Sequence, residues 1–241
     1  MILLIDAGNT RIKLARVSGD TWAEVSELPT QRVSELGQMV AGWQEIQQVW
    51  VSNVAGATVE QHIRAACATR SWMPEFITAC AMQCGVTNAY IQPDQLGSDR
   101  WAALLAAWHQ LRDACLVVSC GTATTIDALS AEGNFMGGLI LPGLELMQHS
   151  LFAATAQLSA GQALYMPFPD RTDAAIFSGA VQASCGAIER QYALLGRRDI
   201  PVLLSGGAAE ILQTHLKMQK QVMNNLVLQG LLLIAREANK R

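Results

Sequence analysis

The sequence predicts an α/β fold of two similar lobes, each a mixed sheet flanked by helices. Residues 1–10 and 116–124 follow one plan: an apolar run, one polar residue, a spacer, a glycine, and then small polar or hydroxyl residues. In each half, three predicted strands are followed by alternating helix and strand, which is typical of α/β proteins. With 51% apolar and 15% charged residues, the 241-residue chain can fill packed cores, which argues against disorder.

In the first half, apolar runs that end at polar residues or glycine predict five strands, at 2–6, 11–17, 21–27, 48–52 and 76–78. The spacing of apolar residues predicts three helices, at 33–44, 57–70 and 98–112. Residues 85–97 contain Gly, Asn and Pro and are expected to form a loop that leads directly into the third helix.

The second half repeats this order. Strands are predicted at 115–119, 123–129, 135–141 and 200–205, and helices after Pro142-Gly143 and at 173–195, 208–217 and 223–238. Residues 152–171 are expected to be irregular. The lobes are therefore predicted as 1–113 and 114–241.

Composition and patterning exclude several classes of protein. The net charge is −3 and no long basic run occurs, which disfavours nucleic acid as a partner. The six cysteines lack zinc-site spacing and are expected to be reduced thiols of a cytoplasmic protein. An acid at position 6 and the absence of a long apolar stretch predict neither a signal peptide nor a membrane span. Neither a P-loop nor a GxGxxG segment is present.

The first polar turn runs from Asp6 to Lys13. A strand that breaks at glycine lets backbone N–H groups approach a ligand closely, and hydroxyls and amides beyond it can donate to phosphate oxygens. An acid at a strand tip can hold Mg²⁺ directly or through water. An ordinary Asn/Gly hairpin turn would explain the same residues. A similar turn occurs in each half, so the pattern suggests two lobes that bind one phosphorylated ligand between them.

The segment Leu96–Trp101 lies where a loop becomes a helix. In one interpretation Asp99 is a general base beside a substrate and Arg100 pairs with developing charge. In the other, Ser98 or Asp99 simply caps the helix. Tyr90, upstream, is either a pocket wall or loop packing.

The second turn, Gly121–Asp127, is also a phosphate-binding candidate, although threonines favour strands for other reasons. Ser205-Gly206-Gly207 repeats the order of strand, glycine and helix, and that helix N-terminus could face a base, ribose or phosphate.

Taken together, these segments resemble the type III pantothenate kinases over nearly the whole chain. The ordered signature reads Asp6-Ala-Gly-Asn-Thr10, Leu96-Gly-Ser-Asp-Arg-Trp101, Gly121-Thr-Ala-Thr-Thr-Ile-Asp127 and Ser205-Gly-Gly207. The resemblance implies two actin-like (ribonuclease H-like) lobes. It also implies phosphorylation of the 4′-hydroxyl of pantothenate by ATP, the first step towards coenzyme A, in a homodimer that uses Mg²⁺ and usually a monovalent cation.

The resemblance also implies roles for individual residues. Asp99 would be the proton acceptor. The residues implied to bind ATP are Asp6, Ala7, Gly8, Asn9, Thr10, Arg11, Ile12, Lys13 and Thr122. Those implied to bind pantothenate are Tyr90, Gly97, Ser98, Asp99, Arg100 and Thr172.

One position departs from the family pattern. Family members usually carry an aspartate that helps to bind K⁺ where this chain has Ser119. A neutral hydroxyl cannot match a carboxylate for a cation, so activation by K⁺ or NH₄⁺ is expected to be weak or absent. Two alternatives remain beside a pantothenate kinase: a kinase for another small hydroxylated substrate, and a non-catalytic regulator that retained the fold.

Overall fold

Contacts divide the chain into two units, each built around its own sheet. The structure is a computed structural model, and it describes residues 1–23, 25–154 and 164–240. The first unit comprises Met1–Gln110 together with Leu226–Arg241, and the second comprises Leu111–Asn225. The C-terminal helix thus groups with the first unit, whereas the predicted lobes placed it in the second. The division into two actin-like lobes otherwise remains a prediction.

The sheet of the first unit has the strand order β3-β2-β1-β5-β6, and β4 also pairs with β2. Strand β1 is antiparallel to β2 and parallel to β5, so the sheet is mixed. The strands are β1 (Ile2–Ala7), β2 (Arg11–Ser18), β3 (Thr21–Trp22), β4 (Ser26–Pro29), β5 (Gln48–Asn53) and β6 (Pro74–Phe76). A short antiparallel hairpin joins β7 (Met82–Gln83) to β8 (Val86–Asn88).

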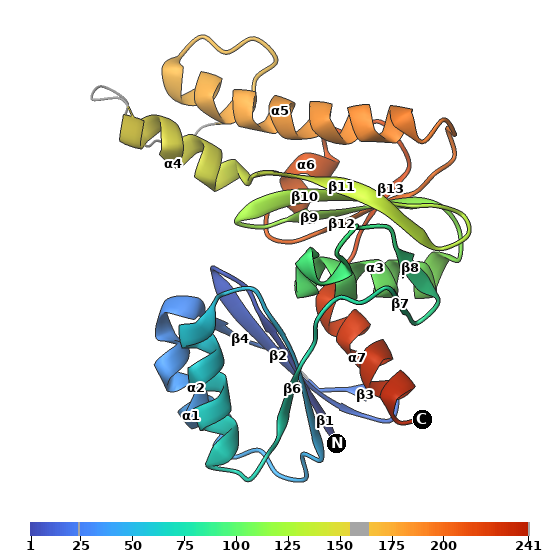
Figure 1. Cartoon of the computed structure of the whole chain (residues 1–241). Helices are drawn as coiled ribbons and strands as arrows, with labels where there is room; N and C mark the ends of the chain where they lie inside the picture. The colour runs from blue at the N-terminus through green and yellow to red at the C-terminus, as the bar shows by residue number, and fades with distance from the viewer. Residues whose placement is uncertain (24, 155–163, 241) are drawn as a thin grey trace. The chain divides into compact units, whose positions relative to one another are not determined.

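Helices cover both faces of this sheet (Figure 1). Because side chains alternate along a strand, Leu3, Ile5 and Ala7 point to one face, where they pack with residues of α1 and α2. Leu4 and Asp6 point to the other face, where α7 packs on β1 and β5. The helices of this unit are η1 (Thr30–Glu35), α1 (Leu36–Met39), α2 (Ala57–Ala68), η2 (Pro93–Gln95), α3 (Ser98–Leu111) and α7 (Leu226–Ala238).

Helix α3 is held against α7 by a close approach of their backbones. A Cβ atom at Gly230 would overlap the carbonyl oxygen of Ala102, so only glycine fits there. The indole Nε1 of Trp101 donates to Oε1 of Gln83 at 2.9 Å, which ties the same turn of α3 to the β7–β8 hairpin. The start of α3 therefore has a defined place in the first unit.

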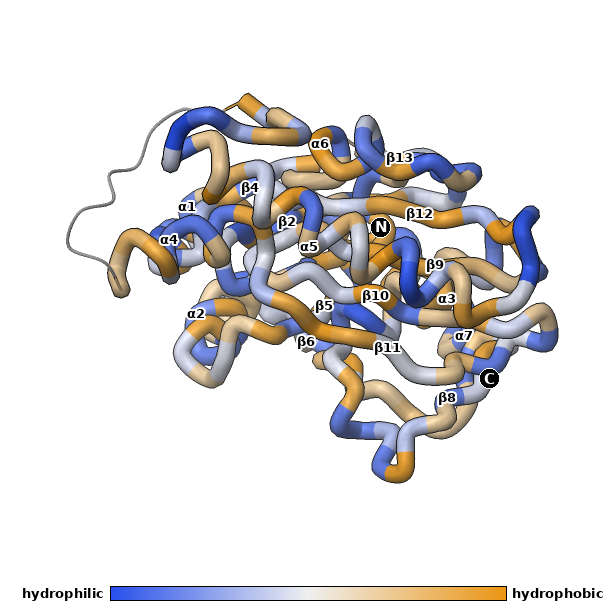
Figure 2. The backbone as a smooth tube through the Cα atoms, turned by 90° about the horizontal axis from the view of Figure 1, so that it is seen from above, coloured by the Kyte–Doolittle hydropathy of each residue, from blue (hydrophilic) through white to orange (hydrophobic). Residues whose placement is uncertain are grey.

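Within the second unit, the sheet order is β13-β12-β9-β10-β11. Strand β9 is antiparallel to β10 and parallel to β12, and β12 is hydrophobic along most of its length (Figure 2). The elements are β9 (Cys115–Cys120), β10 (Ala123–Leu129), β11 (Asn134–Pro142), α4 (Leu144–Ala154), α5 (Thr172–Leu194), β12 (Val202–Ser205), α6 (Ala209–Gln213) and β13 (Lys220–Val222). Residues of α5 and α6 pack on one face of this sheet.

The two sheets repeat one topology. In each, a hairpin of antiparallel strands (β1–β2 or β9–β10) is followed through the chain by a strand (β5 or β12) that pairs in parallel with the first. The predicted α/β fold with two mixed sheets flanked by helices is confirmed, and the repeat in the sequence corresponds to this repeated topology.

Several predicted elements differ from the structure. The helix predicted at 33–44 is only the short pair η1 and α1, because Gly37 and Gly42 weaken a helix there. The strand predicted at 21–27 is split into β3 and β4, and residue 24 lies outside the described residues. The helix predicted at 208–217 is limited to α6, and the sequence analysis missed β13.

The predicted loop 85–97 contains β8 and η2. Of the stretch predicted to be irregular, residues 155–163 lie outside the described residues. All six cysteines carry free thiols. No helix among the described residues is long and apolar enough to cross a membrane.

Candidate active site

The β1–β2 turn is closed by hydrogen bonds at Gly8. Its N–H donates to the Arg11 carbonyl at 3.0 Å, and Thr30 Oγ1 donates to the Gly8 carbonyl at 2.7 Å. Asn9 and Thr10 stand exposed at the tip of the turn. Thr30 is not among the residues predicted for this turn, since nothing in its local sequence indicates the contact.

The remaining predicted ATP-binding residues divide by burial. Ala7 and Ile12 are buried in the core, so only their backbone groups could reach a ligand. Arg11 and Lys13 both reach Glu27 on β4, with N–O distances of 3.3 and 3.5 Å. These cations therefore stand beside the turn, held by one carboxylate.

Asp6 occupies the centre of a row across three strands. Strand register places it opposite Lys13 of β2 and Ser52 of β5, so the three side chains leave the same face of the sheet. Burial raises the pKa of Asp6 to about 7, the negative charge of Asp99 adds to the rise, and Lys13 opposes it. The structure thus brings Asp6 and Asp99 close enough for their charges to interact.

Asp99 lies in the first turn of α3. Burial raises the pKa of its carboxyl, while the Arg100 N–H and the Arg100 charge lower it. The Asp99 Oδ1 accepts a hydrogen bond from the Arg100 N–H at 2.8 Å. A Cβ at Gly97 would lie 2.7 Å from that oxygen, so this glycine makes room for the carboxylate. A capping side chain accepts from the N–H two or three residues on, so this contact with the next residue is not a standard N-cap. The raised pKa beside a second carboxylate suits a general base.

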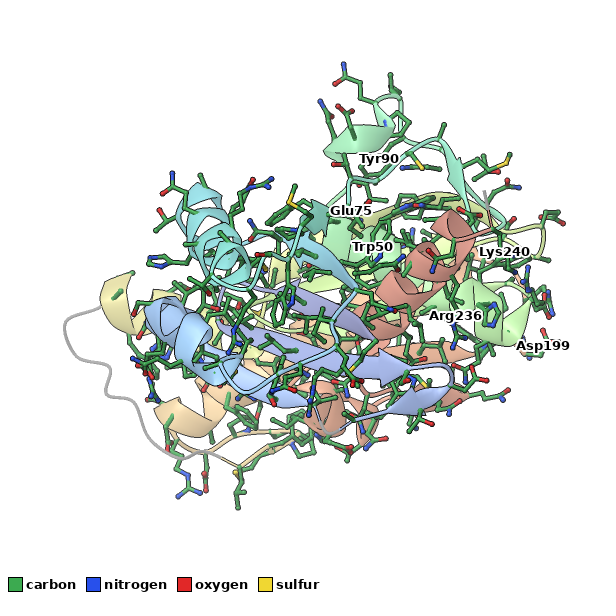
Figure 3. All side chains as sticks on the ribbon, turned by 90° about the horizontal axis from the view of Figure 1, so that it is seen from below. Trp50, Glu75, Tyr90, Asp199, Arg236 and Lys240 are labelled. Carbon is green, nitrogen blue, oxygen red and sulfur yellow. The ribbon has the colours of Figure 1, made fainter. Side chains whose placement is uncertain are left out.

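Arg100 and Tyr90 form a second part of the site. Arg100 is only 6% exposed, and its Nη1 donates to the Tyr90 hydroxyl at 3.2 Å. Asn88 fixes the loop, since its Oδ1 accepts from the Tyr90 N–H at 3.0 Å and its Nδ2 donates to the Pro93 carbonyl at 3.1 Å. Tyr90 lies in the segment between β8 and α3 (Figure 3). The predicted substrate segment is therefore one connected cluster in the first unit.

Ser98 is buried at the start of α3, and its partner comes from a strand end. Its hydroxyl lies 2.9 Å from the hydroxyl of Ser52, which is fully buried. Ser52 was missed by the sequence analysis, because only the register of β5 beside β1 shows that it stands next to Asp6.

The second turn, between β9 and β10, is held by backbone contacts. The Gly121 N–H donates to the Ala123 carbonyl at 3.1 Å, and the Gly143 N–H donates to the Thr122 carbonyl at 2.9 Å. A Cβ at Gly143 would overlap the Gly121 carbonyl oxygen, and one at Gly206 would lie 2.5 Å from that of Cys120. Thr122 is exposed beside these glycines, as a ligand-binding turn requires.

Ser119 stands where the first unit has Asp6. Register places it opposite Thr125 of β10 and Ser205 of β12, so this row holds hydroxyls only. The Thr125 hydroxyl is buried without a hydrogen-bond partner among the described residues. Within those residues, no group of three His, Cys, Asp or Glu side chains could hold a metal ion. The row at Ser119 thus offers hydroxyl oxygens and no carboxylate.

Thr172 is the first residue of α5. It lines an apolar pocket of about 400 Å³ between α4 and α5. The other lining residues are Met147, Leu151, Ala175, Ile176, Gly179 and Ala180.

Solved structures support the fold. The chain resembles a Campylobacter jejuni protein described as a conserved Baf family transcriptional activator, with a TM-score of 0.64, 20% identity, and coverage of 99% of this chain and 100% of that chain. It also resembles a Sinorhizobium meliloti protein described as a 2-dehydro-3-deoxygalactonokinase, with a TM-score of 0.61, 15% identity, and coverage of 99% of both chains. At these identities the likeness concerns the fold alone.

Sequence comparison is more specific. A family model described as type III pantothenate kinase matches residues 2–194. A type III pantothenate kinase of Nitrosospira multiformis is 46% identical over 249 residues, covering 100% of this chain and 93% of the relative. One of Aromatoleum aromaticum is 46% identical over 241 residues, covering 98% of both. The chain therefore belongs to the type III pantothenate kinase family, the ATP-dependent kinases that phosphorylate pantothenate in coenzyme A biosynthesis.

Proposed function

We propose that Asp99 accepts the proton of the 4′-hydroxyl of pantothenate as this oxygen attacks the γ-phosphorus of ATP. The observation that carries the proposal is the burial of Asp99, which raises its pKa. A general base works best when its pKa lies near the working pH, and burial moves a carboxyl in that direction. Phosphoryl transfer otherwise depends mainly on positioning and on stabilising charge.

The β1–β2 turn, Asp6–Lys13, is proposed to hold the phosphates of ATP. Its exposed tip and the cations of Arg11 and Lys13 support this role, and Thr122 supplies a further nucleotide contact from the second turn. Mg²⁺ would be held by Asp6, directly or through water, and would neutralise charge on phosphate oxygens. The site suits a cation on electrostatic grounds, because the negative charges of Asp6 and Asp99 repel each other and a nearby Mg²⁺ would relieve that repulsion.

Pantothenate is proposed to bind the cluster of Tyr90 and Gly97–Arg100. The guanidinium of Arg100 is held by Tyr90 and is suited to pair with the carboxylate of pantothenate or with developing charge. Ser98 is already engaged with Ser52, so its part in the pocket is mainly to place the backbone. Thr172 is proposed to contact pantothenate as well.

The second row of side chains leads to a proposal about monovalent cations. K⁺ takes several oxygen ligands, and the row at Ser119 offers hydroxyls without a carboxylate. We therefore expect that K⁺ or NH₄⁺ is bound weakly there or not required.

A homodimer is proposed through the second unit. Large apolar side chains are exposed on β11 and α4 of this unit: Met136, Leu139, Ile140, Leu146 and Leu151. Exposed apolar side chains are candidates for contact with a second copy of the chain. Light scattering at assay concentration tests this, and an active monomer would contradict it.

The substrate is tested by ADP release. Pantothenate should release ADP from ATP, whereas pantetheine and simple sugars should serve less well. Release with a sugar but not with pantothenate would favour a kinase for another substrate, and no release with any of them would favour a non-catalytic regulator.

The role of Asp99 is tested by Asp99→Asn, which should keep the fold but lower kcat about 10²–10⁴-fold, because general-base catalysis contributes that much. Asp113→Asn is the matched control, since Asp113 Oδ1 accepts from the next backbone N–H at 2.7 Å, as Asp99 does. A near-normal kcat for Asp99→Asn would leave Asp99 with a structural role only.

A further inference from the structure

We propose that Ser52 is a positioning residue for phosphoryl transfer, acting through Ser98 to fix the carboxylate of Asp99. The inference rests on the proposed role of Asp99 as the proton acceptor. It concerns a residue that touches neither substrate in the proposal and that lies outside every motif of the sequence analysis.

The place of Ser52 is set by strand register. In β5, Val49 and Val51 point into the core beside α1 and α2, so Trp50 and Ser52 point to the opposite face. Ser52 pairs in register with Asp6 of β1, and it is 0% exposed. Trp50 of the same face lies beside α7 (Figure 3). Ser52 therefore presents a buried hydroxyl beside Asp6.

The hydroxyl has a partner one residue away from the proposed base. The Ser52 and Ser98 Oγ atoms are 2.9 Å apart, and either can be the donor. Ser98 is 8% exposed and is the first residue of α3. Removing one hydroxyl of a buried pair leaves the other short of a hydrogen bond, which destabilises the folded protein. The contact thus ties the end of β5 to the start of α3.

The body of α3 already has its own anchor at Ala102, against Gly230 of α7. Trp101 is held by Gln83 and Arg100 bonds Tyr90, and the contact with Ser52 adds a hold at Ser98, the residue directly before Asp99. Gly97 leaves the space that the carboxylate occupies, because a Cβ there would lie 2.7 Å from Asp99 Oδ1. Small displacements matter here, because a misplacement of about 1 Å can cost about 10²-fold in rate.

The central experiment is a double-mutant cycle on kcat with Ser52→Ala, Ser98→Ala and the double variant. Ser52→Ala should lower kcat about 10-fold while the KM for ATP is unchanged. The double variant should be no slower than the slower single variant, because both remove one contact. Ser52→Thr, which keeps the hydroxyl, should restore most of kcat. Additive losses, or a normal kcat for Ser52→Ala, would overturn the proposal.

Two further variants separate positioning from stability and from the role of Asp99. Ser184 is equally buried and donates to the Ala180 carbonyl at 3.0 Å, so Ser184→Ala removes a buried hydroxyl elsewhere in the chain and should leave kcat unchanged. In an Asp99→Asn background, Ser52→Ala should lower kcat no further, and a further loss would show that Ser52 does not act through Asp99. A normal kcat for Asp99→Asn alone would instead contradict the proposed base and, with it, this inference.

Discussion

The two polar turns share a backbone arrangement but differ in charge. In the first unit Asp6 stands between Lys13 and Ser52. In the second, Ser119 stands between Thr125 and Ser205 in the same register. Because the strand pairing is the same, the difference in chemistry comes from side chains alone. The first turn concentrates charge, whereas the second offers hydroxyls and closely packed backbone.

The turns also differ in what holds them. The Thr30 side chain ties down the first turn at Gly8, where a Cβ would lie 3.2 Å from the Arg11 carbonyl oxygen. The second turn depends on glycines, since Cβ atoms at Gly143 and Gly206 would meet its backbone. A side-chain hydrogen bond from Thr30 therefore supports the first turn. Close backbone packing, which only glycine permits at positions 143 and 206, supports the second.

The largest expected effect tests the charge of the first turn. Asp6→Asn should reduce kcat/KM for Mg-ATP about 10²-fold or more, the size of effect seen when a group that stabilises charge is removed. Pantothenate binding should change far less. The two ligands are titrated separately, with Asp20→Asn as a control for an exposed acid of the same unit that pairs with Arg236. Equal losses for both ligands would contradict the assigned role.

The second prediction tests the packing of the other turn. Gly143→Ala should destabilise the protein by about 1–3 kcal/mol, because the new methyl group has no space. Gly8→Ala should cost less, and Gly186→Ala, with nothing within 4 Å of its Cβ, should be neutral or stabilising. Thermal unfolding measures all three. A smaller loss of stability for Gly143→Ala than for Gly8→Ala would contradict the view that the second turn depends more on glycine packing than the first.

A third prediction concerns stability and pH. The pKa of Asp6 is about 7 in the folded chain, against an ordinary 3.8. The folded state therefore binds more protons in this range, and stability falls as pH rises from about 4 to 7. Without ligands, Asp6→Asn should raise Tm at pH 8, with a gain of at least about 1 kcal/mol, since one pKa unit corresponds to about 1.4 kcal/mol. The gain should vanish near pH 4, and a gain independent of pH would exclude titration as its cause.

The smallest expected effect concerns the row of hydroxyl side chains at Ser119, Thr125 and Ser205. Initial rates of the wild type in Na⁺, K⁺ and NH₄⁺ buffers of equal ionic strength should be similar. Ser119→Asp adds a carboxylate among oxygen donors, so K⁺ should then raise its rate and its Tm. A strong K⁺ requirement in the wild type that Ser119→Asp leaves unchanged would show that this position does not set cation dependence.

Short-range sequence patterns were enough to predict several strands of both sheets. Apolar runs that end at small or polar residues predicted β1, β9 and β12, and the signature segments predicted the Asp99 cluster. The prediction of a helix at 33–44 was wrong, because Gly37 and Gly42 lower the helix propensity of a segment whose apolar spacing favours a helix. Strand β13 is short, and Lys220-Gln-Val gives little signal.

Other features arise from long-range packing. Ser52 becomes relevant only when β5 lies beside β1, and Thr30 only when it reaches the Gly8 carbonyl. The association of α7 with the first unit depends on a glycine fit between Gly230 and Ala102. No pattern within a window of the sequence encodes these contacts.

The position of α7 has a consequence for synthesis on the ribosome. The first unit needs Leu226–Ala238, yet Leu111–Asn225 must be translated before that segment. At about 5–20 residues per second, the sheet face that α7 covers would wait on the order of ten seconds for its helix. During that interval Leu4 and Trp50 lack the helix that packs on their strands, so an apolar face of the sheet stays uncovered until α7 has been made.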